Sequence, residues 1–132
     1  CLIMSAAVSD FRPQKPYNKK IKRKNRLSIT LLANKDILRE LAKHKKRKLF
    51  IGFSLETENL IGNSRRKLKN KNLDLVVANS LTKSSNPFGD NKLDVYLIGK
   101  NGDIAEIRKK NKAFIAHVLL DKIEELWYLK NK

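Results

Sequence analysis

The sequence contains very few of the residues that cross-link a chain or ligate zinc. Cys1 is its single cysteine, and His44 and His117 are its two histidines. One cysteine excludes a disulfide framework and a cysteine-based zinc site. Neither histidine has metal-binding neighbours at a ligand spacing. We therefore expect no metal held by these side chains, and the single cysteine agrees with a reducing cytoplasm.

Long apolar runs are also absent. No segment approaches the length of a membrane span, and no signal peptide precedes the first apolar segment. We therefore expect a cytoplasmic protein that makes no contact with a membrane. With 132 residues, of which 41% are hydrophobic, the chain has room for one compact domain and not for two.

Acidic residues are scarce, with 13 Asp and Glu against 30 Lys and Arg, and the net charge is +17. Such an excess favours a polyanionic partner, whether a nucleoside triphosphate, a nucleic acid or an acidic membrane. Lysine occurs 22 times, asparagine 13 times and arginine only 8 times. Lysine and asparagine both have A-rich codons, so the competing explanation is an AT-rich genome, which would raise the lysine count with no function attached.

The five glycines never gather into a glycine-rich loop. The chain contains neither the G-x-G-x-x-G pattern nor the Walker lysine motif. If the protein binds phosphate groups, it must therefore use lysines, helix ends and the backbone at strand ends.

Apolar periodicity predicts alternating strands and helices. The predicted strands cover residues 2–4, 27–32, 49–54, 72–79, 93–98 and 104–107, and the last two flank Asn101-Gly102, a strong hairpin signal. The predicted helices cover residues 35–43, 59–71 and 111–130. The expected apolar face of the last helix consists of Phe114, Ile115, Val118, Leu119, Ile123, Leu126 and Trp127. The expected fold is α/β, with a mainly parallel sheet flanked by helices, an antiparallel hairpin and a C-terminal helix.

The first candidate site follows the strand at residues 2–4. Asp10 and Phe11 come shortly after it, and ligands of open α/β sheets bind outside the carboxyl ends of the strands. A plain surface turn is the alternative. Residues 12–26 contain eight cations and no acidic residue. If this loop is extended, Lys20 and Lys22 lie on one side of it and Ile21 on the other.

Two further features indicate an anion site. Asn34 is the predicted N-cap of the helix at 35–43, and free N–H groups at a helix start bind anions; an ordinary capped surface helix is the alternative. Lys67 and Lys71 are four residues apart on the next helix, so they repel one another unless an anion lies between them. Phe53 ends a strand and is either a core residue or a surface for stacking a base. The basic run 44–48 is interpreted as a solvated helix end.

Five motifs, in order, resemble the phosphopantothenoylcysteine synthetase family, the ligases of coenzyme A biosynthesis. They are Ala6-Ala7-Val8-Ser9-Asp10-Phe11-Arg12, Lys20-Ile21-Lys22-Arg23, Asn34-Lys35-Asp36-Ile37-Leu38, Gly52-Phe53-Ser54-Leu55-Glu56-Thr57-Glu58 and Lys67…Lys71-Asn72-Leu73-Asp74. The family usually has proline where Lys35 stands here. That proline suits a first helical position, so its loss should cost preorganisation only.

The resemblance implies a Rossmann-like fold and a ligase that joins 4′-phosphopantothenate to cysteine with CTP and Mg²⁺, through an acyl-cytidylate. ATP in place of CTP remains open. It implies a homodimer, and FMN only if a decarboxylase is fused upstream. The implied catalytic residue is Lys20, and the implied nucleotide-binding residues are Ala6, Asp10, Lys20, Lys35, Asp36, Ile37, Leu38, Phe53, Lys67 and Lys71. Asp10 would bind the ribose or help with the metal. The polar loop at 80–91 corresponds to a flap over the substrate in the family; a plain connecting loop is the alternative.

The chain enters directly into a buried-strand pattern, so residues 1–132 are expected to be the C-terminal part of the ligase domain. In the family, a glycine-rich turn and an asparagine lie upstream, and neither has a counterpart here. Two other classes of function stay open: a basic nucleic-acid-binding module, which the net charge alone supports, and a non-catalytic dimerisation half.

Overall fold

The computed structural model describes residues 1–81, 89 and 91–132. The segment interpreted as a flap, residues 80–91, therefore lies mostly outside the described residues. In chain order the elements are β1 (Leu2–Met4), β2 (Phe11–Pro13), β3 (Leu31–Ala33), α1 (Ile37–Ala42), β4 (Phe50–Glu56), α2 (Leu60–Asn70), β5 (Leu75–Ser80), β6 (Leu93–Gly99), β7 (Ile104–Lys110) and α3 (Lys112–Asn131). None of the described helices is long and apolar enough to span a membrane.

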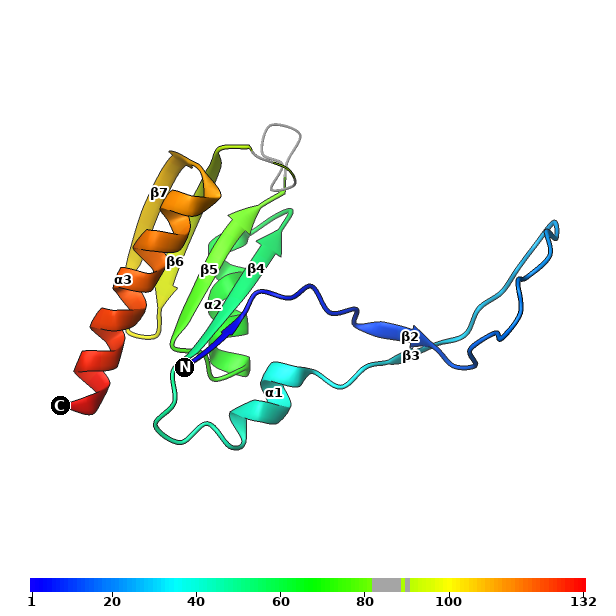
Figure 1. Cartoon of the computed structure of the whole chain (residues 1–132), viewed down its shortest axis with the longest axis horizontal. Coiled ribbons are helices and arrows are strands. Elements are labelled where there is room, and N and C mark those ends of the chain that lie inside the picture. Colours follow the sequence, from blue (N-terminus) through cyan, green and yellow to red (C-terminus); the bar gives the residue numbers. More distant parts are fainter. Residues whose placement is uncertain (82–88, 90) are drawn as a thin grey trace.

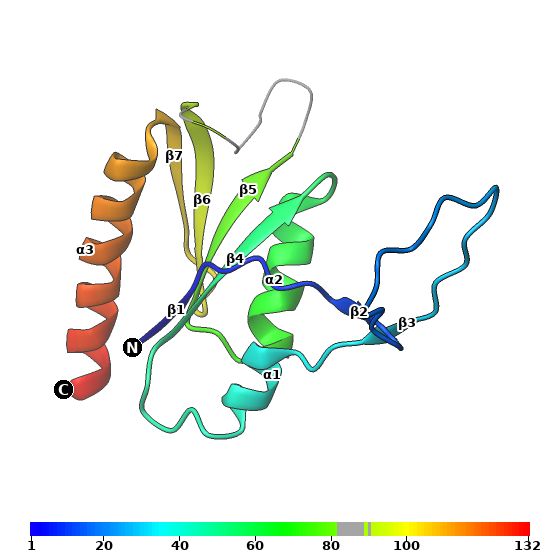
Figure 2. The same cartoon turned by 45° about the vertical axis from the view of Figure 1, so that its right-hand side comes forward.

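The main sheet has the strand order β1-β4-β5-β6-β7 (Figures 1 and 2). β1, β4 and β5 run parallel to one another. β6 is antiparallel to β5, and β7 is antiparallel to β6. The turn between β6 and β7 contains Gly102, whose positive φ of 92° is a conformation that glycine adopts without strain. The predicted α/β fold class is confirmed, and so is the hairpin.

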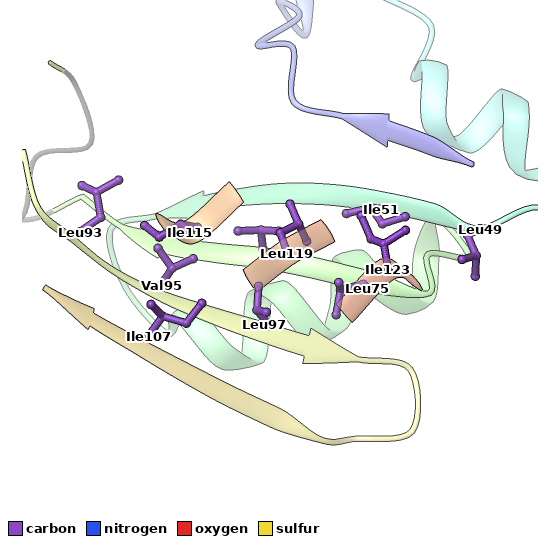
Figure 3. Close-up of a cluster of buried hydrophobic side chains, with 11 residues drawn as sticks. Leu49, Ile51, Leu75, Leu93, Val95, Leu97, Ile107, Ile115, Leu119 and Ile123 are labelled. Atoms are coloured by element: carbon purple, nitrogen blue, oxygen red, sulfur yellow. The ribbon is translucent and has the colours of Figure 1, made fainter. Parts of the chain in front are cut away.

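Helices cover both faces of this sheet. Successive residues of a strand point to opposite faces, and β5 illustrates this: Leu75 and Val77 belong to one buried cluster, and Val76 and Ala78 belong to the other. The first cluster lies beneath α3 (Figure 3). The second includes Leu38 of α1 and Leu68 of α2, so these two helices cover the opposite face.

The C-terminal helix packs on the sheet through a narrower face than the sequence predicts. Ile115, Leu119 and Ile123 are buried and recur every four residues, which places them on one stripe. Phe114 and Trp127 are each 45% exposed. Phe114 precedes Ile115 by one residue and so points about 100° away from the stripe. Trp127 lies beyond the last buried residue of the helix.

The predicted strand at 27–32 is confirmed only at Leu31 and Leu32. The strand here is β3, which pairs antiparallel with β2 in a separate two-stranded sheet. We call residues 9–34, which contain both strands, the arm; it extends away from the main sheet (Figure 1). Because the arm has no core beneath it, its alternating apolar residues stay exposed, as at Leu27, Ile29 and Leu31. The predicted loop at 12–26 is also corrected, since Arg12 and Pro13 belong to β2.

The predicted N-cap of α1 is wrong by two residues. Asp36 is the cap, and its carboxylate accepts a hydrogen bond from the N–H of Arg39 at 3.2 Å. The side chain of Asn34 instead joins two segments: its Nδ2 donates to the carbonyl of Ser9 at 2.8 Å, and its Oδ1 accepts from Arg12 at 2.9 Å. Asn34 therefore fixes the base of the arm.

Lys45 corrects the interpretation of the run 44–48 as solvated. Its side chain is only 5% exposed, and its Nζ lies 2.7 Å from the carboxylate of Asp74. Asp74 also accepts from the N–H of Phe50 at 2.7 Å and from Lys130 at 3.2 Å. This group, which we call the Asp74 cluster, joins the segment before β4, the start of β5 and the end of α3. The other members of the run are exposed.

Candidate functional site

A cavity of about 830 Å³ opens at the carboxyl ends of the parallel strands. The segment after β1, the start of α1 and the end of β4 line it, together with lysines of α2 and the first turns of α3. β5 contributes Val77 and Asn79, and the start of β6 contributes Leu93 and Val95. Ligands of α/β sheets bind at this edge because several strands end there together.

The cavity brings together nine of the ten residues that the resemblance assigns to the nucleotide. Those nine are Ala6, Asp10, Lys35, Asp36, Ile37, Leu38, Phe53, Lys67 and Lys71. They come from four separate segments of the chain, which the fold places around one space. Lys20 does not line the cavity; it lies on the exposed arm, which extends away from the main sheet (Figure 2).

Lys67 is fixed at the end of β4. Its Nζ donates a hydrogen bond to the carbonyl of Phe53 at 2.5 Å. Burial, together with the nearby charge of Lys71, holds the pKa of Lys67 below its usual range. An anion beside this ammonium would offset both effects, because an opposite charge favours the protonated form. An anionic group in the cavity would therefore stabilise the charge of Lys67.

Lys71 already has an anionic neighbour. Its Nζ lies 2.9 Å from Oδ2 of Asp36, the N-cap of α1. Burial by itself would raise the pKa of Asp36, but the hydrogen bonds from Lys71 and from the N–H of Arg39 outweigh it and leave that pKa lowered. A carboxylate of the chain itself thus offsets part of the repulsion expected between Lys67 and Lys71.

Asp10 reaches the cavity from the base of the arm. Its carbonyl accepts a hydrogen bond from the N–H of Asn34 at 2.8 Å, so the segment after β1 is tied to the segment before α1. The described residues contain no group of three or more His, Cys, Asp or Glu side chains that could hold a metal. Asp10 therefore lines the cavity without belonging to such a group among the described residues.

Comparison with known proteins assigns the chain to a family. Residues 1–126 match the family described as the DNA/pantothenate metabolism flavoprotein C-terminal domain. The chain belongs to this family. The resemblance found in the sequence motifs is confirmed at this level.

Individual relatives agree with this flavoprotein C-terminal domain assignment. A cysteine/cysteine sulfinic acid decarboxylase of an unknown prokaryotic organism is 41% identical over 123 residues, which are 92% of this chain and 34% of that protein. The coenzyme A biosynthesis bifunctional protein CoaBC of Borreliella burgdorferi is 40% identical over 123 residues, which are 90% of this chain and 30% of that protein. The chain thus spans about a third of the length of these relatives.

The fold agrees as well. The crystal structure of the C-terminal domain of a coenzyme A biosynthesis bifunctional protein CoaBC superposes with a TM-score of 0.73 at 28% identity, covering 98% of this chain and 55% of that one. The DNA/pantothenate metabolism flavoprotein from Streptococcus pneumoniae has the same fold, with a TM-score of 0.70 at 23% identity, covering 91% of this chain and 60% of that one.

One polar residue of this flavoprotein-family cavity was not anticipated. Asn79 lines the cavity at the end of β5, and its Oδ1 is buried with no hydrogen-bond partner among the described residues. A buried acceptor without a partner is costly, so a ligand that donates a hydrogen bond there would be favoured. The sequence signal was available: Asn79 is the first polar side chain after the apolar run 75–78.

Phe53 combines the two roles between which the sequence left a choice. It is partly buried and packs against the cluster beneath α3, and it also lines the cavity. Phe53 is therefore both a core residue and a residue of the cavity wall.

Proposed function

We propose that this chain forms the nucleotide-binding side of a ligase that joins 4′-phosphopantothenate to cysteine with CTP, in coenzyme A biosynthesis. The observation that carries the proposal is the cavity at the strand ends, which nine residues of the family's nucleotide motifs line together. The CoaBC names of the relatives support the pathway, since each match covers nearly the whole of this chain.

In the proposed reaction, a carboxylate oxygen of phosphopantothenate attacks the α-phosphorus of CTP. The bond to the bridging oxygen breaks, pyrophosphate leaves, and an acyl-cytidylate forms. The amine of cysteine then attacks the acyl carbon, CMP leaves, and the nitrogen loses a proton. Negative charge builds up on phosphate oxygens in the first step, so preorganised cations are the most useful catalytic groups. Lys67 and Lys71 would supply that charge from the chain.

The other lining residues would position the nucleotide. Phe53 would stack on the base, Asn79 would accept a hydrogen bond from it, and Asp10 would accept hydrogen bonds from the ribose hydroxyls. Mg²⁺ would neutralise the phosphate oxygens. It usually binds through one or two carboxylates and the substrate's phosphates, which fits a cavity with few carboxylates and no three-residue metal group within the described part of the chain.

In this scheme, Lys20 acts on the nucleotide that a second copy of the chain binds. The arm extends away from the main sheet (Figure 1), and Lys20 on it does not line the cavity of its own chain. Exposed large hydrophobic residues are concentrated on the arm, among them Phe11, Tyr17 and Ile29, and exposed apolar surface of this kind is typical of an interaction site. We therefore propose a homodimer in which the arm presents Lys20, as the catalytic cation, to the partner's nucleotide.

We further propose that residues 1–132 alone do not complete the ligation. β1 pairs only with β4, and its other edge has no strand partner among the described residues. An upstream segment would add to that edge and close the site. Positioning supplies a large share of the rate acceleration in such a reaction, so one side of the site should be nearly inert.

The test is release of pyrophosphate from CTP in the presence of phosphopantothenate and cysteine. It is measured on this chain with and without the upstream half of the ligase domain of the Borreliella relative, added as a separate polypeptide. We expect little turnover by the chain alone and a clear gain with the added segment. Full turnover by the chain alone would refute the need for that segment. No gain, together with no binding of CTP, would refute the ligase.

A further inference from the structure

The carboxylate of Asp36 occupies the position where an anion is expected. Its Oδ2 lies 2.9 Å from Nζ of Lys71, and its Oδ1 accepts the N–H of Arg39 at 3.2 Å. Asp36, Lys71 and Lys67 all line the cavity. The ion pair is only partly covered, with side-chain exposures of 27% for Lys71 and 37% for Asp36. A ligand in the cavity can therefore reach both partners.

We propose that Asp36 is a resident counter-ion of Lys71 that an incoming phosphate chain must displace. Asp36 would thereby lower the affinity of the cavity for highly charged phosphates such as pyrophosphate. This inference rests on the nucleotide-binding function proposed above. It concerns the carboxylate of Asp36, whereas the family motif only places this residue against the nucleotide.

The two lysines differ in the charges that surround them. Lys67 is anchored to the carbonyl of Phe53 and has no carboxylate within ion-pair distance among the described residues, whereas Lys71 has Asp36. A phosphate chain that bridges both lysines must take Lys71 from Asp36. The carboxylate stays close to the ligand afterwards, because its other oxygen remains the N-cap of α1. The carboxylate of Asp36 and the phosphate chain then repel one another, and this repulsion grows with the charge of the phosphate chain.

The penalty applies to pyrophosphate and to CTP alike. Pyrophosphate would have to compete with Asp36 using its charge alone, whereas CTP offsets the penalty through additional contacts at Phe53 and Asn79. Asp36 would thus reduce trapping of the released pyrophosphate while the intact nucleotide still binds. Asp36 would position Lys71 and would also lower the affinity for polyphosphates that make no contact with the cavity other than through their charge.

The substitution Asp36→Asn isolates the charge. Asparagine caps helices about as well as aspartate, so α1 should keep its start while Lys71 loses its counter-ion. Glu40→Gln is the matched control: Glu40 lies on the same helix and pairs with Lys43 at 2.8 Å, but it does not line the cavity. Circular dichroism and thermal unfolding would verify that both variants retain the fold.

Calorimetric titrations with pyrophosphate, CTP and CMP test the proposal. For Asp36→Asn we expect affinity for pyrophosphate and CTP to rise by about 3- to 10-fold, the scale of one partly exposed charge interaction. Affinity for CMP should rise less than twofold, and Glu40→Gln should leave all three unchanged. In a Lys71→Met background the gain from Asp36→Asn should largely disappear, as expected for coupled residues.

The titration of Asp36 itself gives an independent readout. Because Lys71 lowers its pKa in the free protein, pyrophosphate should raise that pKa when it displaces the carboxylate, which ¹³C NMR of the carboxyl carbon measures. Unchanged or weaker pyrophosphate binding by Asp36→Asn, or an unchanged titration of Asp36 under saturation, would overturn the counter-ion role while leaving CTP binding intact. Failure of the unsubstituted chain to bind either CTP or pyrophosphate would instead overturn the proposed function and the counter-ion role together.

Discussion

Buried Lys45 and partly buried Lys67 differ in the group that neutralises each ammonium, and this difference distinguishes a structural lysine from a candidate ligand-binding one. Lys45 has the carboxylate of Asp74 at 2.7 Å, so its charge is satisfied within the protein. Lys67 has only the carbonyl of Phe53 and lines the cavity. We interpret Lys45 as part of the structural core and Lys67 as the cation held ready for a ligand.

Removing the carboxylate of the Asp74 cluster should be costly. Asp74→Ala leaves Lys45 buried without its partner, and breaking a buried pair in this way costs about 3–5 kcal/mol. Urea denaturation measures the loss in the free energy of unfolding. Glu125→Ala is the control, since it removes an exposed pair with Lys122 and should cost at most about 1 kcal/mol. Equal losses in the two variants would show that the cluster is not structural.

The same carboxylate gives stability a defined dependence on pH. Burial would raise the pKa of Asp74, but hydrogen bonds from Lys45, from the N–H of Phe50 and from Lys130 outweigh it, so the pKa lies below its ordinary value of 3.8. The stabilisation is therefore complete above that ordinary value and is lost as the pH falls through the lower native pKa. In Asp74→Asn this acid-dependent loss should be absent.

Lys67 predicts a dependence of the opposite kind, in the binding of nucleotide at alkaline pH. Because burial lowers its pKa below 10.5, it loses its proton before exposed lysines do. Affinity for CTP should be complete below the native pKa of Lys67 and decline as the pH rises through it. In Lys67→Arg the guanidinium stays charged, so the decline should begin at a higher pH. Calorimetric affinities measured from pH 7.5 upward in both proteins check this, and identical profiles would contradict it.

At the level of the elements, adjacent leucines of α3 provide a test of how that helix packs. Leu119 is buried in the cluster beneath the helix, whereas Leu120 is 54% exposed. Leu119→Ala should lower the free energy of unfolding by about 2–4 kcal/mol through the lost burial and the cavity it leaves. Leu120→Ala should change it by no more than about 0.5 kcal/mol. Similar losses in denaturant unfolding would mean that the helix faces the sheet differently.

The elements that depend on local pattern could be predicted from the sequence. The buried runs became β4 and β5, and Asn101-Gly102 became the turn of the β6–β7 hairpin. Pattern alone could not show that residues 27–32 lie on an arm without a core. The same alternation of side chains suits a buried strand and an exposed one, and only the position in the fold distinguishes them.

Ion pairs between residues that are far apart in the sequence could not be predicted either. Asp36 and Lys71 are 35 positions apart, and Lys45 and Asp74 are 29 apart, so neither pair follows a local rule. The lining residues of the cavity could be assigned because they occur in recognisable motifs. The unpaired Oδ1 of Asn79 could not, since hydrogen-bond satisfaction is a property of the folded chain.

For the whole molecule, the arm predicts the oligomeric state. Replacing residues 15–29 with Asn-Gly would close a two-residue hairpin between Gln14 and Thr30, which already share a backbone hydrogen bond of 2.9 Å. The removed residues are exposed, so stability should hardly change. We expect the intact chain to sediment as a dimer in analytical ultracentrifugation and the shortened chain as a monomer. Identical sedimentation of the two would contradict dimerisation through the arm.

The central claim is that the cavity binds a nucleoside triphosphate rather than that the net charge binds nucleic acid. Isothermal titration calorimetry decides between these, with CTP and Mg²⁺ in one experiment and a random single-stranded oligonucleotide in the other, both at about 0.15 M salt. We predict saturable CTP binding below about 1 mM that Lys67→Ala weakens by about 1.5–3 kcal/mol, while the oligonucleotide binds weakly. Tight oligonucleotide binding with a steep salt dependence, and no CTP binding below millimolar, would contradict the claim.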